Sequence, residues 1–226
     1  MPDFFVIARV VGSDGAYPKW KDRLVALCTV SKTEPHSTTY YWGQDVDNEP
    51  DTIWGLEGYT HAVGFFLGHP ASDVFKSEMQ KVDNDRLLRH VQGLGSPDYD
   101  LKYYDYHAGF LKRPDDPDRD ATDSFVVIIH LSSGLGRRKQ VLGLLADSAD
   151  AVRSEKSMSV QSFAVLKEVM QENLCSVYIR SWESLQATPT YQHLIAELER
   201  NEVTVEVHRS QAFNGHIDQE PPRERP

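Results

Sequence analysis

Cysteine is almost absent from this chain of 226 residues. Its two cysteines, Cys28 and Cys175, stand far apart and outside any C-x-x-C pattern. This spacing argues against a structural zinc site and against a framework of disulfides. A reducing, cytoplasmic environment is the simplest interpretation.

Basic charge is also scarce, because 24 Lys and Arg residues stand against 34 Asp and Glu, a formal net charge of −10. Nucleic acids and anionic membranes require basic surfaces, so neither is expected as a partner. No apolar run approaches the roughly 18 residues of a membrane-spanning helix. The first residues, MPDFFVIARVV, lack the basic start and the small-residue cleavage site of a signal peptide. We therefore expect a soluble cytoplasmic protein.

Signatures of cofactor and metal binding are lacking too. The chain has neither a Gly-rich phosphate loop nor a G-x-S-x-G nucleophile elbow. His61 and His69 have no carboxylate or thiol nearby at helical spacing that would complete a metal site. We expect no metal and no cofactor.

What the chain does contain is enough apolar sequence, 40% of its residues, to build two cores. Residues 113–124, dense in Asp and Pro, predict a linker. It would separate a first domain, residues 1–112, from a second, residues 125–215. The polar residues 216–226 predict a flexible tail.

The two halves repeat one order of elements: strand, helix, two strands, helix, strand. The expected ranges are 4–11, 17–34, 38–44, 52–59, 61–92 and 99–110 in the first half, and 125–133, 136–155, 160–169, 176–184, 187–200 and 203–213 in the second. This order, β-α-β-β-α-β, predicts two tandem ferredoxin-like domains of the α+β class, each with its helices on one face of an antiparallel sheet. The bare faces would pack sheet to sheet, as an intrachain dimeric α+β barrel.

Short motifs in the first half resemble those of a known family. Glu57-Gly-Tyr59, followed by His69-Pro-Ala-Ser72-Asp-Val-Phe75, is similar to the Glu-x-Trp and His-x-x-Ser-x-x-Phe pattern of the antibiotic-biosynthesis monooxygenase family. Tyr59 stands where that pattern has tryptophan.

Two further segments carry the resemblance. Glu34-Pro35, followed by Tyr40, is similar to the family's Glu-Pro-Gly…Tyr segment, with histidine in place of the glycine. In the second half, Arg180-Ser-Trp182 takes the Glu-x-Trp position and Thr188-Pro-Thr-Tyr191 the Ser-x-x-Phe position. The second half lacks the family histidine.

The resemblance implies a dimeric α+β barrel fused into one chain. Several family members oxidise polyketide-derived phenols, anthrones or quinols with O₂ and without metal or flavin, so a small aromatic substrate and O₂ are the implied partners. Relatives with the same fold process haem, cyclise polyketides or decarboxylate. A non-oxidative cyclase, isomerase or decarboxylase and a non-catalytic binding barrel are therefore alternatives. Further dimerisation of the fused chain is left open.

Three residues are the catalytic candidates: His69, Tyr59 and Glu57. Strand alternation places Glu57 and Tyr59 on one face. A carboxylate on an apolar strand either forms a salt bridge, for example with Arg180, or has a raised pKa suited to proton transfer. His69 lies at a helix break before Pro70 and would take a proton near neutral pH, unless it is only a capping or surface histidine.

Aromatic residues gather in the first half, where they would stack on a flat ligand or simply form core. The substrate-binding candidates are Tyr40, Trp42, Trp54, Phe65, Tyr104, His107, Arg180 and Trp182. His107, two residues after Asp105, is a second candidate base.

Overall fold

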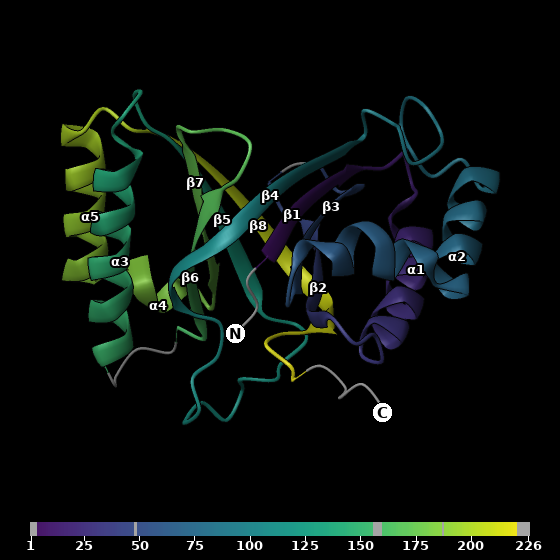
Figure 1. Ribbon diagram of the computed structural model, residues 1–226, viewed down its shortest axis with the longest axis horizontal. Coiled ribbons are helices and arrows are strands. Elements are labelled where there is room, and N and C mark those ends of the chain that lie inside the picture. Colours follow the sequence, from purple (N-terminus) through teal and green to yellow (C-terminus); the bar gives the residue numbers. More distant parts are fainter. Residues whose placement is uncertain (1–3, 48, 156–159, 187, 221–226) are drawn as a thin grey trace. The chain divides into compact units, whose positions relative to one another are not determined.

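The computed structural model describes residues 4–47, 49–155, 160–186 and 188–220, which form α+β structure (Figure 1). The strands are β1 (Phe4–Val11), β2 (Ser37–Asp45), β3 (Thr52–Tyr59), β4 (Tyr99–Phe110), β5 (Phe125–Ser132), β6 (Ser162–Glu168), β7 (Leu174–Arg180) and β8 (Thr204–His216). The α-helices are α1 (Tyr17–Ser31), α2 (Asp73–Asn84), α3 (Arg138–Ser154), α4 (Glu183–Gln186) and α5 (Pro189–Arg200).

Hydrogen-bonded strands follow the order β1-β3-β2-β8-β5-β7-β6-β4, a closed barrel. The register is antiparallel along β1–β3, β2–β3, β2–β8, β4–β6, β5–β7 and β6–β7. The element order of each half is the predicted β-α-β-β-α-β, extended in the second half by the short α4. The predicted fold class, two tandem ferredoxin-like motifs in an α+β barrel, is confirmed.

The chain folds into two compact units, unit 1 (Met1–Lys102 and Ser210–Pro226) and unit 2 (Tyr103–Arg209). Two strands belong to both. The later part of β4 pairs with β6 in unit 2, and the later part of β8 pairs with β2 in unit 1. The predicted linker, residues 113–124, lies in unit 2.

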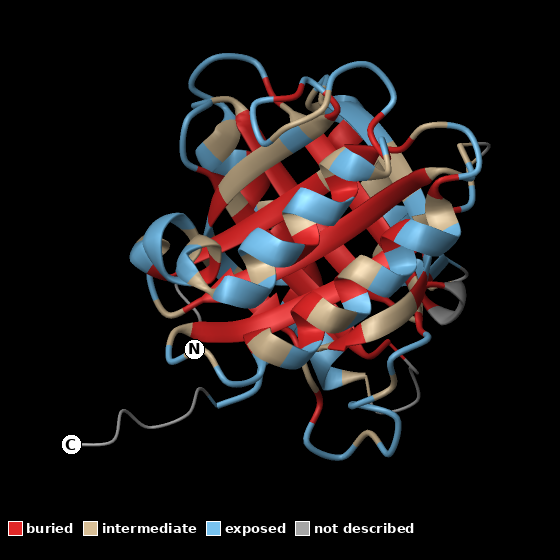
Figure 2. Ribbon diagram, turned by 90° about the vertical axis from the view of Figure 1, so that its right-hand side faces the viewer, coloured by how far each residue is buried: buried red, intermediate tan, exposed pale blue. Residues whose placement is uncertain are grey.

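In unit 1, α1 packs its apolar face on the sheet. Trp20, Leu24, Leu27 and Cys28 recur at helical spacing, and all are buried. They share a core with Ile53 of β3, which fixes the helix-facing side of that strand. In Figure 2, α1 and α2 present exposed outer faces while the strands behind them are buried.

The second helix of each unit begins at the same kind of cap. The Ser72 hydroxyl accepts a hydrogen bond from the Phe75 amide at 3.1 Å, and the Thr188 hydroxyl accepts one from the Tyr191 amide at 3.1 Å. The Ser-x-x-Phe and Thr-x-x-Tyr motifs are therefore N-caps followed by a packed aromatic ring.

The single helix expected over residues 61–92 is wrong, because the structure breaks it. A π-helix, η1 (Gly64–Gly68), is followed by a 3₁₀ turn, η2 (His69–Ala71), before α2 begins. Two glycines and Pro70 disfavour a continuous α-helix there. Likewise β7 ends at Arg180, because Ser181 adopts a left-handed backbone with φ of 60°. Among the described residues, no helix is both long and apolar enough to cross a membrane.

Candidate active site

His69 lies at the start of η2 in unit 1, with its side chain only 3% exposed. Its Nδ1 is 2.8 and 2.9 Å from the two carboxylate oxygens of Glu34, which follows α1. A carboxylate only accepts, so the Nδ1–H donates and Nε2 carries the lone pair of the neutral ring. Among the described residues, none forms a hydrogen bond with this buried Nε2.

The electrostatic surroundings make His69 a stronger base. Burial alone would lower the pKa of the imidazole, but the hydrogen bond to Glu34 and the negative charges of Glu57 and Glu34 outweigh it. The pKa of His69 is therefore raised above its ordinary value. A raised pKa increases the affinity of Nε2 for a proton.

Glu57 and Tyr59 lie side by side on the helix-facing side of β3, as strand alternation predicts. The Tyr59 hydroxyl donates to the Glu57 carboxylate at 2.6 Å. Burial raises the pKa of Glu57, although the positive charge of His69 and the Tyr59 hydrogen bond act in the opposite direction. Burial and the neighbouring Glu57 charge hold the pKa of Tyr59 well above its ordinary value, so its hydroxyl stays protonated.

Aromatic rings surround this polar group. The ring centroid of His69 is 5.4 Å from that of Tyr40 and 5.0 Å from that of Phe75. Tyr40 lies 5.7 Å from Trp42, and Phe65 lies 5.8 Å from Tyr59. The structure thus gathers a buried imidazole, two carboxylates and several rings from distant segments of unit 1.

Sequence reasoning missed one member of this cluster. Glu34 carries the hydrogen bond that orients His69, yet it was not among the candidate site residues. The signal was present, because Glu34-Pro35 is one of the segments similar to the family pattern. What the sequence did not supply was a reason to place Glu34 next to His69.

Trp54 lies on the other face of β3 from Glu57. Its indole Nε1 donates to Asp45 at 2.9 Å, and Arg9 lies over the ring. Tyr104 is buried in unit 2, where its hydroxyl is 2.9 Å from that of Ser176. Whether either residue contacts a ligand stays a prediction.

Three further candidates also belong to unit 2. The buried Arg180 guanidinium donates to the Ser162 hydroxyl and to backbone carbonyls, including that of Arg119. Trp182 packs edge-on against Tyr191 with ring centroids 4.7 Å apart. His107 is exposed, and partial burial with the Lys167 charge lowers its pKa. Their proposed role in substrate binding stays a prediction.

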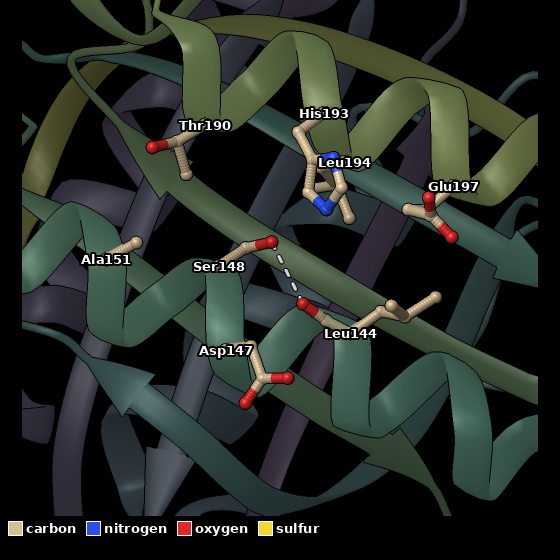
Figure 3. A pocket seen from close by; sticks show the side chains of 8 residues that line it. All are labelled: Leu144, Asp147, Ser148, Ala151, Thr190, His193, Leu194 and Glu197. Atoms are coloured by element: carbon tan, nitrogen blue, oxygen red, sulfur yellow. Dashed lines mark hydrogen bonds between the residues drawn. The ribbon is translucent and has the colours of Figure 1, made fainter.

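A groove of about 310 Å³ lies between α3 and α5 in unit 2 (Figure 3). It is lined by Leu144, Asp147, Ser148, Ala151, Thr190, His193, Leu194 and Glu197. The Ser148 hydroxyl donates to the Leu144 carbonyl at 2.9 Å. The groove contains none of the residues predicted from the sequence. Among the described residues, no group of three or more His, Cys, Asp or Glu side chains is arranged to hold a metal ion.

No protein-family model matches the chain, and no curated protein sequence is significantly similar to it. Solved structures are similar in fold. A provisionally assigned monooxygenase from Lactobacillus acidophilus NCFM has a TM-score of 0.76 at 10% identity, covering 97% of this chain and 98% of that one. Another, from Fusobacterium nucleatum subsp. nucleatum ATCC 25586, has a TM-score of 0.79 at 8% identity, covering 96% of this chain and 95% of that one.

An anthrone oxidase-like protein has a TM-score of 0.64 at 10% identity and covers 100% of this chain and 98% of its own. The names of these proteins agree with the family that the motifs resemble. At such low identities the likeness establishes the shared fold, and the chemistry has to be argued from the site.

Proposed function

We propose that this protein is a monooxygenase that oxidises a flat aromatic phenol, anthrone or quinol of the polyketide type with O₂, using His69 as its base. The observation that carries the proposal is the buried Nε2 of His69. Its lone pair has no protein partner among the described residues, and its basicity is raised by Glu34 and Glu57. A lone pair held in this way suits the removal of a substrate proton.

In the proposed reaction, His69 Nε2 takes a proton from the anthrone methylene or from a phenol. The resulting anion is delocalised over the rings and passes one electron to O₂. The two radicals combine into a peroxide, which takes the proton back. Loss of water from the peroxide then leaves a quinone. The substrate supplies all the electrons, so this chemistry requires no bound redox group.

The carboxylates around His69 have different roles in this proposal. Glu34 holds the Nδ1–H and fixes which nitrogen faces the substrate. Glu57 stabilises the imidazolium that forms on proton transfer, because its charge acts on His69. Tyr59 donates a hydrogen bond to Glu57 and keeps that carboxylate in place.

The surroundings of His69 support an aromatic substrate. Tyr40 and Phe75 pack against the imidazole, and Trp42 extends the aromatic surface along β2. Flat rings stack well on such surfaces, and a dry site strengthens the electrostatic stabilisation of an anion.

Oxygen consumption by the purified full chain with a simple anthrone, in the presence of a chelator, tests this proposal. We expect uptake well above the uncatalysed rate, and a loss of about 10²- to 10⁴-fold in His69→Ala, the usual contribution of a general base. His193→Ala, which removes an exposed histidine of α5, is the matched control and should consume oxygen like the wild type.

Two results would count against the proposal. No uptake above the uncatalysed rate, with anthrone bound, would indicate a non-oxidative enzyme such as a cyclase, isomerase or decarboxylase. Uptake that persists in His69→Ala would remove His69 from the role of base.

A further inference from the structure

The segment Gly64-Phe65-Phe66-Leu67-Gly68 leads directly into His69 and has an unusual backbone. It forms the π-helix η1, and the amide of His69 still donates to the Gly64 carbonyl. The 3₁₀ turn η2 follows without an intervening α-helical turn. Short π-helical turns are rare in proteins, and many of those that do occur lie at functional sites.

On its inner side, this segment packs against the candidate active site. The Phe65 ring meets Tyr59 edge-on, with centroids 5.8 Å apart. Tyr59 in turn binds Glu57. Phe65 also contacts Phe66 at 5.0 Å. Phe65 therefore packs on Tyr59, which lies next to the polar cluster, from the side of η1.

On its outer side, the same segment exposes large apolar side chains. Val63, Phe66 and Leu67 are 51%, 52% and 68% exposed. Three such residues within five positions form an apolar surface next to a buried polar site. Apolar surfaces of this kind mark places where ligands or partners bind.

The burial of His69 creates a problem of access. The imidazole is only 3% exposed, so an aromatic molecule cannot reach Nε2 unless a covering segment moves. The two glycines differ in how much space surrounds them. A Cβ on Gly64 would lie 2.7 Å from the Cβ of His36, whereas a Cβ on Gly68 would have its nearest neighbour at 3.8 Å. The backbone of Gly68 is therefore less closely surrounded than that of Gly64.

We propose that Gly64–Gly68 is a gate that admits an apolar aromatic molecule to His69. The molecule first binds to the outer surface formed by Val63, Phe66 and Leu67. Phe65 then leaves Tyr59, with Gly68 as the hinge, and the aromatic molecule takes its place. The identity of the ligand rests on the proposed function, but the gate itself does not.

Chemical modification of His69 by diethylpyrocarbonate tests the gate without any substrate. This reagent reacts with an unprotonated imidazole nitrogen that it can reach, and peptide mass spectrometry gives a rate for each histidine. In the full wild-type chain, we expect His69 to react at least about tenfold more slowly than the exposed His193, because modification requires opening. Plateau rates at high pH remove the effect of protonation.

Phe65→Ala should increase the His69 rate about tenfold, because the ring that packs on Tyr59 beside the cluster is gone. The neighbouring change Phe66→Ala should leave the rate within about twofold, because that ring is half exposed and belongs to the outer surface. Phe66→Ala should instead slow the binding of an anthrone, measured by stopped-flow fluorescence.

The hinge has its own matched pair of variants. Gly68→Ala should slow the modification of His69 several-fold, since alanine restricts the backbone and its Cβ meets no close neighbour. Gly143→Ala makes the same change in α3, where an added Cβ has nothing within 4 Å, and should not alter the His69 rate.

Rapid modification of His69 in the wild type, at the rate of His193, would show that no gate shields it. Equal His69 rates in the wild type and in a folded Phe65→Ala variant would also overturn the proposal. Because no substrate is present, a failure to consume oxygen would leave this result unchanged. Conversely, failure of the gate would not affect the oxygen-uptake test.

Discussion

At the scale of single residues, opposing effects act on the pKa of His69. Burial disfavours the imidazolium, whereas Glu34 and Glu57 favour it. The effect of the carboxylates is larger, so the pKa of His69 is raised. The ring is a stronger base as a result, but a smaller fraction of it is neutral at a given pH. This trade-off makes the pH dependence of the reaction informative.

The first prediction concerns that pH dependence. Only the neutral imidazole accepts a proton, so kcat/KM should rise with pH along a limb whose apparent pKa lies above the ordinary 6.5 of histidine. Glu34→Gln removes a charge that raises this pKa but keeps an oxygen that accepts from Nδ1–H. The limb should therefore move to lower pH, and the plateau rate should fall about tenfold because the base is weaker.

NMR titration of His69 in the free protein checks the same point without substrate. Glu49→Gln is the matched control, because it removes a carboxylate that pairs with Arg9 rather than with His69. It should leave the His69 titration unchanged. An unaltered His69 pKa in Glu34→Gln would mean that Glu34 does not act through the imidazole.

Strand alternation was sufficient to place Glu57 and Tyr59 on one face, and their 2.6 Å hydrogen bond confirms it. The pairing of Glu34 with His69 was not predictable from spacing, because they are 35 positions apart in the chain. It depends on how the turn after α1 meets η2, a contact set by tertiary packing. Whether any of these residues contacts a ligand stays a prediction.

At the scale of elements, the start of α2 matters to the site because Phe75, in its first turn, packs on His69. Ser72 fixes that turn by accepting from the Phe75 amide, and Thr188 does the same for α5. The two caps occupy the same position in the element order of each half, which agrees with an internal repeat.

The second prediction is that Ser72→Ala and Thr188→Ala each lower the free energy of unfolding by about 1 kcal/mol, because an amide loses its partner. Urea unfolding measures both. Ser154→Ala removes an exposed hydroxyl that donates to the Asp150 carbonyl within α3, and it should change this free energy by less than about 0.5 kcal/mol. Losses in Ser72→Ala and Thr188→Ala no larger than in Ser154→Ala would contradict the capping role.

Runs of β-branched and aromatic residues predicted the strands closely, although most strands are buried on both faces. The single apolar face of α1, α3 and α5 predicted those three helices. The sequence pattern did not predict η1 and η2. His61, Phe65 and His69 recur every four positions there, as they would on one face of a continuous α-helix. Pro70 indicated a break, but no simple pattern distinguishes a π-helix from an α-helix. The irregular backbone coincides with the candidate site, where local preferences and function often disagree.

At the scale of the whole molecule, the two sequence halves exchange strand segments. Residues 210–216 of β8 pair with β2, and residues 104–110 of β4 pair with β6. Each compact unit therefore contains a strand segment from the other half of the sequence. Element order alone did not predict this exchange, because it depends on how far each closing strand extends.

The third prediction follows from that exchange. Cutting the chain between the exposed Pro117 and Asp118 gives fragments 1–117 and 118–226. The first fragment lacks the segment that pairs with β2, and the second lacks the segment that pairs with β6. Each would expose an unpaired strand edge beside its core, so we expect neither to fold cooperatively alone. Mixing them should restore native circular dichroism. Cooperative unfolding of isolated fragment 1–117 would instead show that the first half is an independent domain.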